Sequence, residues 1–299
     1  MPAENPYADG AAFMEGRYMP ISEARIPITD WGFTRSDVTY DVVHVWQGRF
    51  FRLEDHLDRF ERSAAGLRLN LPHSRQSMRE ILGECVRLTG LRDAYVEMGC
   101  TRGVPPPGTR DPRELRNRYF AFARPFIWIA TEEQRKRGLH LVISQVQRIP
   151  PESVDPTIKN FHWGDLMRGL YEAYDRGGET AVLVDGSGNV TEGPGFNIFV
   201  VKDGQVCTPA RGVLEGITRM TVLELCAECD LPLQLGEVSA QAVRSADEVF
   251  LSSTAGGVLP VTKVDGKALG TGEPGPVTNR LRDLYWSKKE AGWHGTPVQ

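Results

Sequence analysis

One lysine stands in an unusual setting for a surface cation. Lys159 lies in the stretch Asp155–Asp165, DPTIKNFHWGD, where a proline precedes it and the rings of Phe161 and Trp163 follow it. A lysine attacks carbonyl compounds only in its deprotonated form, which a partly dry setting beside apolar rings promotes. The stretch therefore predicts a reactive amine at Lys159, and an ordinary surface lysine after a proline turn is the alternative.

Three further segments have the residue types that hold an anionic ring compound. In Val190–Asn197, VTEGPGFN, a single carboxylate, Glu192, lies among glycines that let backbone approach a ligand closely. In Glu215–Thr218, EGIT, a helix start offers N–H groups to a phosphate, and Ser252–Gly257, SSTAGG, places hydroxyls and glycines at a strand end. Together with one lysine they describe a site for pyridoxal phosphate, which presents an aldehyde, a ring nitrogen and a phosphate.

The elements that must position these segments follow from the periodicity of the apolar residues. In the first half, glycine turns between apolar runs predict hairpins, and helical spacing predicts two helices. A proline- and glycine-rich insertion, residues 104–117, is too long for a tight turn and is typical of a functional loop. The predicted elements are hairpins over 11–19 and 39–53, helices over 56–69 and 74–90, and strands over 94–103 and 118–129.

The second half repeats the mixture of strands and helices after a charged segment. Residues 130–138, ATEEQRKRG, have little apolar content and predict an interdomain linker. We therefore expect an N-terminal α+β domain over 1–129 and a C-terminal cofactor-binding domain over 139–299. Within the second domain the pattern predicts a strand over 140–149, a helix over 164–177, strands over 180–209, a helix over 215–230, and two strands around a glycine-rich turn over 247–269.

Composition limits the classes of partner. The chain has 299 residues with a net charge of −4 and shows no basic stripe, which argues against nucleic-acid binding. No apolar run reaches the roughly 18 to 20 residues of a membrane span, and the N-terminal residues lack a signal pattern. Cys226 and Cys229 form a C-x-x-C inside a helical pattern, which favours ordinary helix cysteines over a metal site. We expect a cytoplasmic protein with small-molecule partners.

The sequence resembles the class IV, or fold type IV, pyridoxal-phosphate aminotransferases, and within them most of all the (R)-selective amine:pyruvate transaminases. The resemblance covers residues 10–280. It implies two domains, a small N-terminal α/β domain and a larger C-terminal domain with a β-barrel-like core. It also implies a homodimer with the active site at the subunit interface. The segments that carry it include ARIPITDWGFTRSDVTYDVVHVWQGRFFRLEDHLDR, YVEMGCTRG, DPTIKNFHWGDL, DRGGETAVLVDG, TEGPGFNIFVVKDG, RGVLEGITR and STAGGVLPV.

The resemblance assigns roles to residues of this chain. Lys159 matches the lysine that forms a Schiff base with the cofactor and then moves the substrate proton. Glu192 matches the carboxylate that keeps the pyridine nitrogen protonated, and Arg52 resembles the arginine that binds phosphate. The remaining phosphate ligands match Ile217, Thr218, Ser253 and Thr254. The positions that line the substrate pockets match Tyr40, Val42, Tyr95, Glu97 and Trp163.

Two arginines bear on the substrate carboxylate. Arg110, in the insertion, is similar to a flexible loop arginine that binds the carboxylate of a keto acid, with a solvated loop arginine as the alternative. Arg35 departs from the pattern, because close relatives usually have a histidine at this place in a HSD triplet. A guanidinium near the pocket would favour amino acids over amines, whereas an Arg35 that points away would pair with an acid.

The resemblance implies a ping-pong transaminase that moves an amino group from an (R)-amine or a D-amino acid to a keto acid such as pyruvate. Three alternatives stay open. The first is a D-amino acid or branched-chain aminotransferase of the same fold, which Arg35 favours. The second is a lyase that removes pyruvate from an aminated chorismate, and the third is a non-catalytic binding protein that retains the fold.

Overall fold

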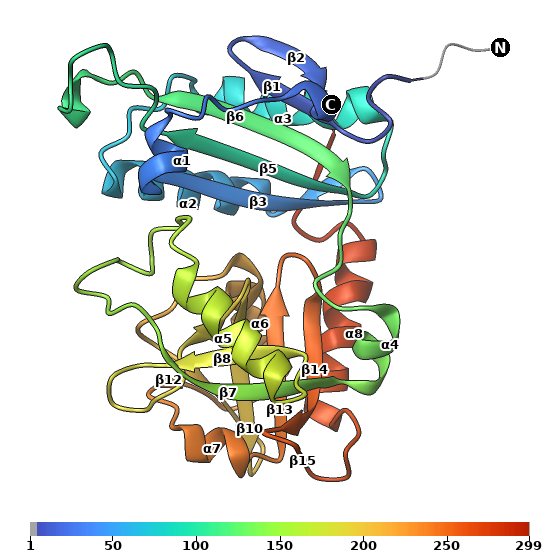
Figure 1. Ribbon diagram of the computed structural model, residues 1–299. Coiled ribbons are helices and arrows are strands. Elements are labelled where there is room, and N and C mark those ends of the chain that lie inside the picture. Colours follow the sequence, from blue (N-terminus) through green and yellow to red (C-terminus); the bar gives the residue numbers. More distant parts are fainter. Residues whose placement is uncertain (1–4, 299) are drawn as a thin grey trace. The chain divides into compact units, whose positions relative to one another are not determined.

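The computed structural model describes residues 5–298, and the contacts within it divide the chain into two compact units (Figure 1). Unit 1 consists of Met1–Ile127, Ile158–Phe161 and Lys289–Gln299, and unit 2 consists of Trp128–Thr157 and His162–Lys288. Each unit combines a sheet with helices, which confirms the expected α+β fold. No helix within residues 5–298 has both the length and the apolar character needed to span a membrane.

Unit 1 is built on one antiparallel sheet whose strand order is β16-β4-β3-β5-β6-β1-β2. Its strands are β1 (Ala11–Met14), β2 (Arg17–Pro20), β3 (Val38–Trp46), β4 (Arg49–Phe51), β5 (Ala94–Thr101), β6 (Arg118–Pro125) and β16 (Gly295–Pro297). Its helices are α1 (Trp31–Arg35), α2 (Leu53–Gly66) and α3 (Arg75–Thr89), with short 3-10 helices at Ile21–Glu23 and Pro112–Glu114.

Local chemistry explains why the hairpins and helices of unit 1 form at the predicted places. The turns Glu15-Gly16 and Gln47-Gly48 have positive φ at both positions, from 50° to 77°. That geometry matches the right-handed twist of the flanking strands. Helix α3 starts at the predicted serine, because Ser74 Oγ accepts the N–H of Ser77.

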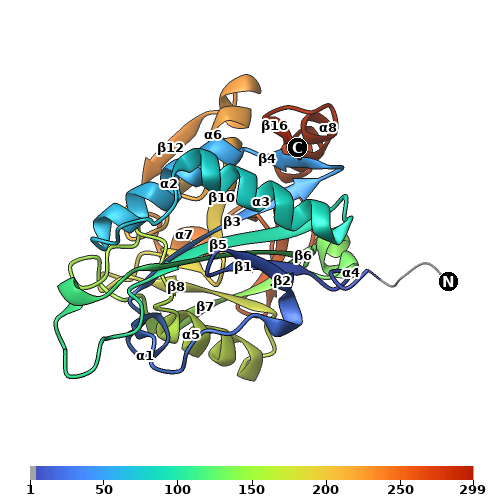
Figure 2. The same ribbon diagram turned by 90° about the horizontal axis from the view of Figure 1, so that it is seen from above.

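Helices α2 and α3 cover one face of the unit 1 sheet (Figure 2). Side chains alternate along β3, so Val43 and Val45 pack with Leu57 and Phe60 of α2 in the hydrophobic core. The alternate residues of β3, including Tyr40 and Val42, belong to the opposite face of the sheet. That opposite face carries the candidate substrate residues.

Unit 2 contains a sheet that closes on itself. Its strands are β7 (Leu139–Gln147), β8 (Thr180–Val184), β9 (Glu192–Gly193), β10 (Phe196–Lys202), β11 (Gln205–Pro209), β12 (Leu233–Gly236), β13 (Glu248–Ser253), β14 (Gly257–Val264) and β15 (Lys267–Ala268). The pairing order within this sheet is β10-β13-β14-β7-β8, and β9 pairs with β10. The Thr191 N–H donates to the Leu183 carbonyl and so joins β8 to the start of β9. This ring matches the expected barrel-like core.

Five helices complete the described part of unit 2. They are α4 (Glu132–Arg137), α5 (Gly164–Asp175), α6 (Ile217–Glu228), α7 (Ala240–Arg244) and α8 (Pro276–Glu290), of which the last two residues belong to unit 1. The prediction that Cys226 and Cys229 belong to a helix is confirmed, since Cys226 lies in α6 and Cys229 is its C-cap.

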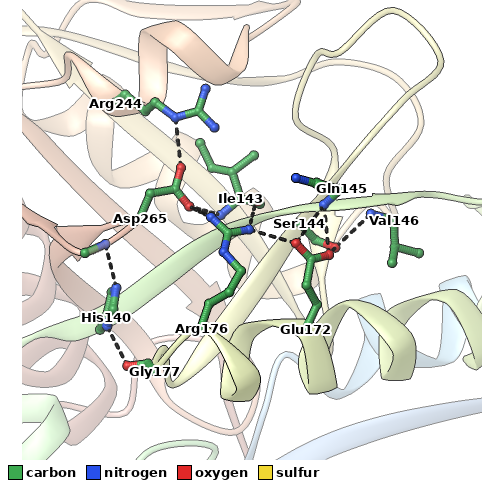
Figure 3. A network of polar contacts seen from close by, with 11 residues as sticks. His140, Ile143, Ser144, Gln145, Val146, Glu172, Arg176, Gly177, Arg244 and Asp265 are labelled. Atoms are coloured by element: carbon green, nitrogen blue, oxygen red, sulfur yellow. Dashed lines mark hydrogen bonds and ion pairs between the residues drawn. The ribbon is translucent and has the colours of Figure 1, made fainter.

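A polar network fastens α5 to β7 (Figure 3). The Arg176 guanidinium donates to Glu172 Oε1 and to Asp265 Oδ1, both at 2.7 Å. Glu172 also accepts from Ser144 Oγ of β7 at 2.5 Å, and Asp265 accepts from Arg244 Nε at 2.8 Å. One arginine thus links two carboxylates and holds the helix in place along the strand.

The predicted domain boundaries stay a prediction, and the contact units differ from them at three places. The segment around Lys159 and the C-terminal residues pack in unit 1. Residues 130–138, predicted as a linker, form helix α4, which packs on β14 within unit 2. The reason is a capping box in which Thr131 and Gln134 satisfy each other's backbone N–H groups, so that a charged segment folds as a surface helix.

Candidate active site

The backbone of Lys159 is held between strand β3 and helix α2. Thr39 Oγ1 donates to the Lys159 carbonyl at 2.7 Å, and the Lys159 N–H donates to Ser63 Oγ at 3.2 Å. Thr39 also forms an antiparallel bridge with Asn160. These contacts explain why Ile158–Phe161, far along the chain, belong to unit 1, and they fix the point from which the lysine side chain extends.

The lysine side chain lies on the face of the unit 1 sheet that α2 and α3 do not cover, which we call the open face. Lys159 Nζ is 4.2 Å from the ring centroid of Tyr40, and the Phe161 ring packs on Tyr40 with centroids 4.5 Å apart. Val42 follows Tyr40 on the same face and pairs across the strands with Glu97. The structure therefore places the predicted amine on the same sheet face as three predicted substrate residues, with the Tyr40 ring as its aromatic neighbour.

Glu97 is the acidic group of this face. Tyr95 Oη donates to Glu97 Oε2 at 3.2 Å, and the Arg124 guanidinium lies 5.0 Å from the Tyr95 ring centroid. Burial raises the pKa of the Glu97 carboxyl to about 7, against the opposing hydrogen bond from Tyr95 and the charges of Lys159 and Arg124. Burial and the neighbouring Glu97 raise the pKa of the Tyr95 phenol, so Tyr95 stays a hydrogen-bond donor.

Arg52, the predicted phosphate ligand, begins helix α2 in a strained conformation. Its φ of 57° is left-handed, which costs a residue other than glycine about 1 to 2 kcal/mol. Its buried guanidinium donates to Asp55 Oδ2 at 2.7 Å, and its N–H donates to the His294 carbonyl at 2.9 Å. The fold therefore fixes this arginine at a defined position, as a ligand-binding cation requires.

A buried charge network joins α2 to β3 beneath the open face. Asp41 Oδ1 lies 2.7 Å from His56 Nδ1, and Arg59 donates to both Asp41 oxygens at 2.8 Å. Burial opposes ionisation of Asp41, but Arg59 and His56 outweigh it and hold its pKa below the usual range. Removing one member of such a network costs roughly 3 to 5 kcal/mol. The two elements that hold Lys159 are thus locked to each other.

In unit 2, Glu192 belongs to a row of three polar residues on adjacent strands. Glu192 of β9 pairs with Asn197 of β10, which pairs with Ser252 of β13, so the three side chains share one face of the sheet. The Leu214 N–H donates to Glu192 Oε2 at 2.9 Å, and Asn197 Nδ2 donates to the Leu214 carbonyl at 2.9 Å. The loop before α6 therefore covers this row and holds the carboxylate.

The start of helix α6 lies against the same row. Its N-cap, Gly216, makes no side-chain cap, so the first-turn N–H groups at Ile217 and Thr218 lack a capping side chain. A Cβ at position 216 would lie 2.2 Å from Asn197 Oδ1, so only glycine allows the helix to start this close. Such a helix start favours an anion.

Hydroxyl groups gather where strand β13 ends. Ser253 Oγ donates to the Gly195 carbonyl at 2.8 Å, and Thr254 follows half-buried in the turn. The buried Ser252 Oγ has no hydrogen-bond partner among the residues that the structure describes. The buried hydroxyl of Ser252 and the start of helix α6 fit the phosphate of pyridoxal phosphate. The fixed carboxylate of Glu192 fits its ring nitrogen.

Three predicted residues stand apart from these clusters. Trp163 is the N-cap of α5 and packs partly buried beside Leu166 and the core of unit 2. The exposed Arg35 stacks on Trp31 of its own helix, with the guanidinium carbon 3.5 Å from a ring centroid. Arg110 is exposed in the insertion loop. The substrate roles of these three residues stay predictions.

Sequence reasoning missed several residues of the candidate site. Arg148 pairs with Glu192, Arg124 lies beside Tyr95, and Ser63 holds the Lys159 backbone. Arg148 stands near the end of a predicted apolar strand, where a cation is a weak signal of a buried acidic partner. Nothing in the sequence points to Ser63, whose partner is 96 residues away.

Comparisons with known proteins show the family to which the chain belongs. Residues 39–264 match the amino-transferase class IV family. The D-alanine aminotransferase of Bacillus licheniformis is 31% identical over 269 residues, which cover 89% of this chain and 93% of that protein. The branched-chain-amino-acid aminotransferase of Pseudomonas aeruginosa is 34% identical over 238 residues, which cover 79% of this chain and 77% of that protein.

A solved structure resembles the whole chain. The branched-chain amino acid aminotransferase from Thermobaculum terrenum, solved in its PLP-form, superposes with a TM-score of 0.87 and 27% identity. The likeness covers 99% of this chain and 99% of that one. The family match spans well over half of the chain and includes both Lys159 and Glu192. The chain therefore belongs to the class IV aminotransferases and is a pyridoxal-phosphate-dependent enzyme.

Proposed function

We propose that the enzyme moves an amino group between an (R)-amine or a D-amino acid and a keto acid such as pyruvate, and that it prefers amines. The observation that carries this proposal is Glu97, a carboxyl group on the same sheet face as Lys159 and Tyr40. An amino acid brings its own carboxylate to the reactive lysine, and two carboxylates about 4 Å apart repel each other by several kcal/mol in a partly buried site. An amine without a carboxylate avoids that repulsion.

We assign roles to the residues that hold the cofactor. Bound pyridoxal phosphate supplies an aldehyde that carries the amino group and a protonated ring that withdraws electrons. Lys159 would bind the aldehyde and would then move a proton to and from the substrate carbon. Glu192 would hold the proton on the ring nitrogen, and the residues that would bind the phosphate are Arg52, Ile217, Thr218, Ser253 and Thr254.

The stereochemistry follows from having one base on one fixed side. Thr39 and Ser63 anchor the Lys159 backbone, so its amine reaches a planar bound group from a single direction. A proton delivered from one side gives a single enantiomer of the product. The resemblance to (R)-selective enzymes assigns that hand as (R) for amines and D for alanine.

A D-alanine or branched-chain aminotransferase is the second candidate. The relatives from Bacillus licheniformis and Pseudomonas aeruginosa carry these names and support it. This candidate requires a cation for the substrate carboxylate, and Arg110 or Arg124 would have to supply it, since Arg35 stacks on Trp31.

We also propose a cytoplasmic homodimer whose active site lies at the subunit interface. Large apolar side chains are exposed on unit 1, with Ile28 at 78% and Phe33 at 70%, which supports burial against a second copy. All five cysteines are free, which supports a reducing compartment.

A half-reaction screen tests the proposed function. The enzyme loaded with pyridoxal phosphate is mixed with (R)- and (S)-1-phenylethylamine, D-alanine or L-leucine, and conversion of the cofactor to its pyridoxamine form is followed by absorbance. We expect conversion by (R)-1-phenylethylamine at a rate at least equal to that of D-alanine, and none by the (S)-amine. Conversion by L-leucine alone would establish the branched-chain alternative, and pyruvate release from an aminated chorismate without any keto acid would establish the lyase.

A further inference from the structure

One arginine to which the family resemblance assigns no role lies between two buried carboxylates. Arg148 follows strand β7 directly, and its Nη1 donates to Asp165 Oδ2 at 2.7 Å. Its Nε and Nη2 donate to Glu192 Oε1 at 3.2 and 3.1 Å. All three side chains are at most 9% exposed. The cluster therefore carries one fixed positive charge for two negative ones.

Arg148 is itself fixed in place. Its backbone N–H donates to the Val184 carbonyl at 2.9 Å. Asp165 accepts the Ile149 N–H at 2.7 Å and stands in the first turn of α5, where the helix dipole favours an anion. The guanidinium is therefore anchored on the Asp165 side and presents its remaining N–H groups to Glu192.

The charge of Arg148 favours the ionised form of Glu192, because the two side chains form a buried ion pair. A buried carboxylate without a nearby cation takes up a proton, since desolvation penalises the charged form. A second carboxylate in the same cluster, Asp165, adds to that tendency. Burial alone would lower the pKa of Arg148, but Glu192 and Asp165 raise it above the ordinary value, so the guanidinium keeps its charge.

We propose that Arg148 is a positioning residue that keeps Glu192 ionised, so that Glu192 can hold a proton on the ring nitrogen of pyridoxal phosphate. The proposal rests on the proposed role of Glu192. A single proton is shared between the ring nitrogen and Glu192, and the guanidinium places it on the nitrogen. Without the guanidinium the proton moves to the carboxyl oxygen, and the ring loses its electron-withdrawing charge.

The chain offers a matched control. Arg176 also lies between two carboxylates of unit 2, Glu172 and Asp265, and stands outside the Arg148 cluster (Figure 3). Arg176→Gln therefore removes a more exposed arginine that also joins two carboxylates, and it leaves the Arg148 cluster intact. Arg148→Lys keeps the charge at the Glu192 cluster while it loses the planar fork.

The test measures where the proton lies. Wild type, Arg148→Gln, Arg148→Lys and Arg176→Gln are loaded with pyridoxal phosphate labelled at the ring nitrogen, and the nitrogen NMR shift reports protonation. We expect a protonated nitrogen in wild type, in Arg148→Lys and in Arg176→Gln, and an unprotonated one in Arg148→Gln. We also expect kcat of Arg148→Gln to fall roughly 10- to 100-fold, in the range typical of residues that orient a functional ligand.

Two outcomes separate this inference from the role of Glu192. If Glu192→Gln leaves the nitrogen protonated, the assigned role of Glu192 fails. If Glu192→Gln removes the proton while Arg148→Gln retains it, the inference about Arg148 is overturned and Arg148 is only structural. Thermal unfolding of each variant without cofactor checks that it folds. If Arg148→Lys is as stable as wild type but its ring nitrogen is unprotonated, the argument from the charge of Arg148 is also overturned.

Discussion

At the scale of single residues, the open face of unit 1 poses a problem of charge. A transaminase that uses an amine and a keto acid must admit a substrate with a carboxylate and one without it at the same lysine. Glu97 can meet both needs, because its raised pKa of about 7 lets it be neutral or charged near physiological pH. The neighbouring groups that lower the pKa of Glu97 are Tyr95, Lys159 and Arg124. Asp41, whose side chain lies on the other face of the sheet, raises it.

We predict that pH selects the substrate class through Glu97. As pH falls from 8 to 6, Glu97 takes up a proton, and the rate with D-alanine relative to (R)-1-phenylethylamine should rise roughly tenfold. In Glu97→Gln this ratio should be independent of pH. In Tyr95→Phe, which lacks the hydrogen bond that favours the charged form, the transition should move to higher pH. A wild-type ratio that does not change between pH 6 and 8, measured in single-turnover half-reactions, would rule out this role.

The buried pair Lys289 and His44 makes the stability of unit 1 depend on pH. Lys289 Nζ lies 2.6 Å from His44 Nδ1, and both side chains are buried. Burial lowers the pKa of Lys289, so the folded chain binds no proton there at a pH where the unfolded chain does. The free energy of unfolding therefore falls as pH is lowered from about 10 toward the depressed pKa of the folded state.

Lys289→Met should remove this pH dependence and raise the free energy of unfolding by roughly 1 to 3 kcal/mol at pH 7. Lys288→Met is the control, since Lys288 forms its ion pair with Glu228 near the surface and should change stability by under about 1 kcal/mol. Urea unfolding at pH 7 and pH 9.5 measures both. A loss of stability in Lys289→Met at pH 7 would show that packing at this position outweighs the cost of burying the amine.

At the scale of elements, the start of helix α6 depends on a close approach. Gly216 lies beside Asn197, which is itself tied to the Leu214 carbonyl and cannot move away easily. Gly216→Ala should displace the helix start by several tenths of an ångström and lower the affinity for pyridoxal phosphate about tenfold. Gly236→Ala, where the nearest side-chain atom is 3.6 Å away, is the matched control. Fluorescence quenching during cofactor titration measures both, and equal affinities would contradict a phosphate role for α6.

Elements with a local cause can be predicted from the sequence. The glycine turns and the spacing in α2 and α3 belong to contiguous residues, so the chain itself carries the signal. Low apolar content does not indicate helix α4 within the predicted linker, because the helix depends on the capping box at Thr131 and Gln134. The assignments of Lys159 and Glu192 follow from motifs and resemblance. Arg148 cannot be found in this way, because its partners lie 17 and 44 residues away and meet it only in the folded chain.

At the scale of the whole molecule, the last described strand, β16, belongs to the same sheet as the first, β1. Strand β16 pairs with β4, and Val298 N–H donates to the Gly48 carbonyl at 3.0 Å. The His294 carbonyl accepts the N–H of Arg52, the predicted phosphate ligand. No sequence pattern indicates this return, since the pairing joins residues about 250 positions apart. The hydrogen bond from Arg52 to His294 thereby helps to fix the backbone of this predicted phosphate ligand.

Removal of residues 291–299 should therefore weaken both stability and cofactor binding. The deletion exposes β4 as an edge strand and frees the strained backbone of Arg52, which the His294 carbonyl holds at φ 57°. We expect a lower midpoint in urea unfolding and a lower affinity for pyridoxal phosphate. Thr296→Ala in the full chain keeps the backbone pairing and should change neither quantity by much. If the deletion lowers the midpoint but leaves the affinity at the wild-type value, β16 stabilises unit 1 without holding Arg52 for the phosphate.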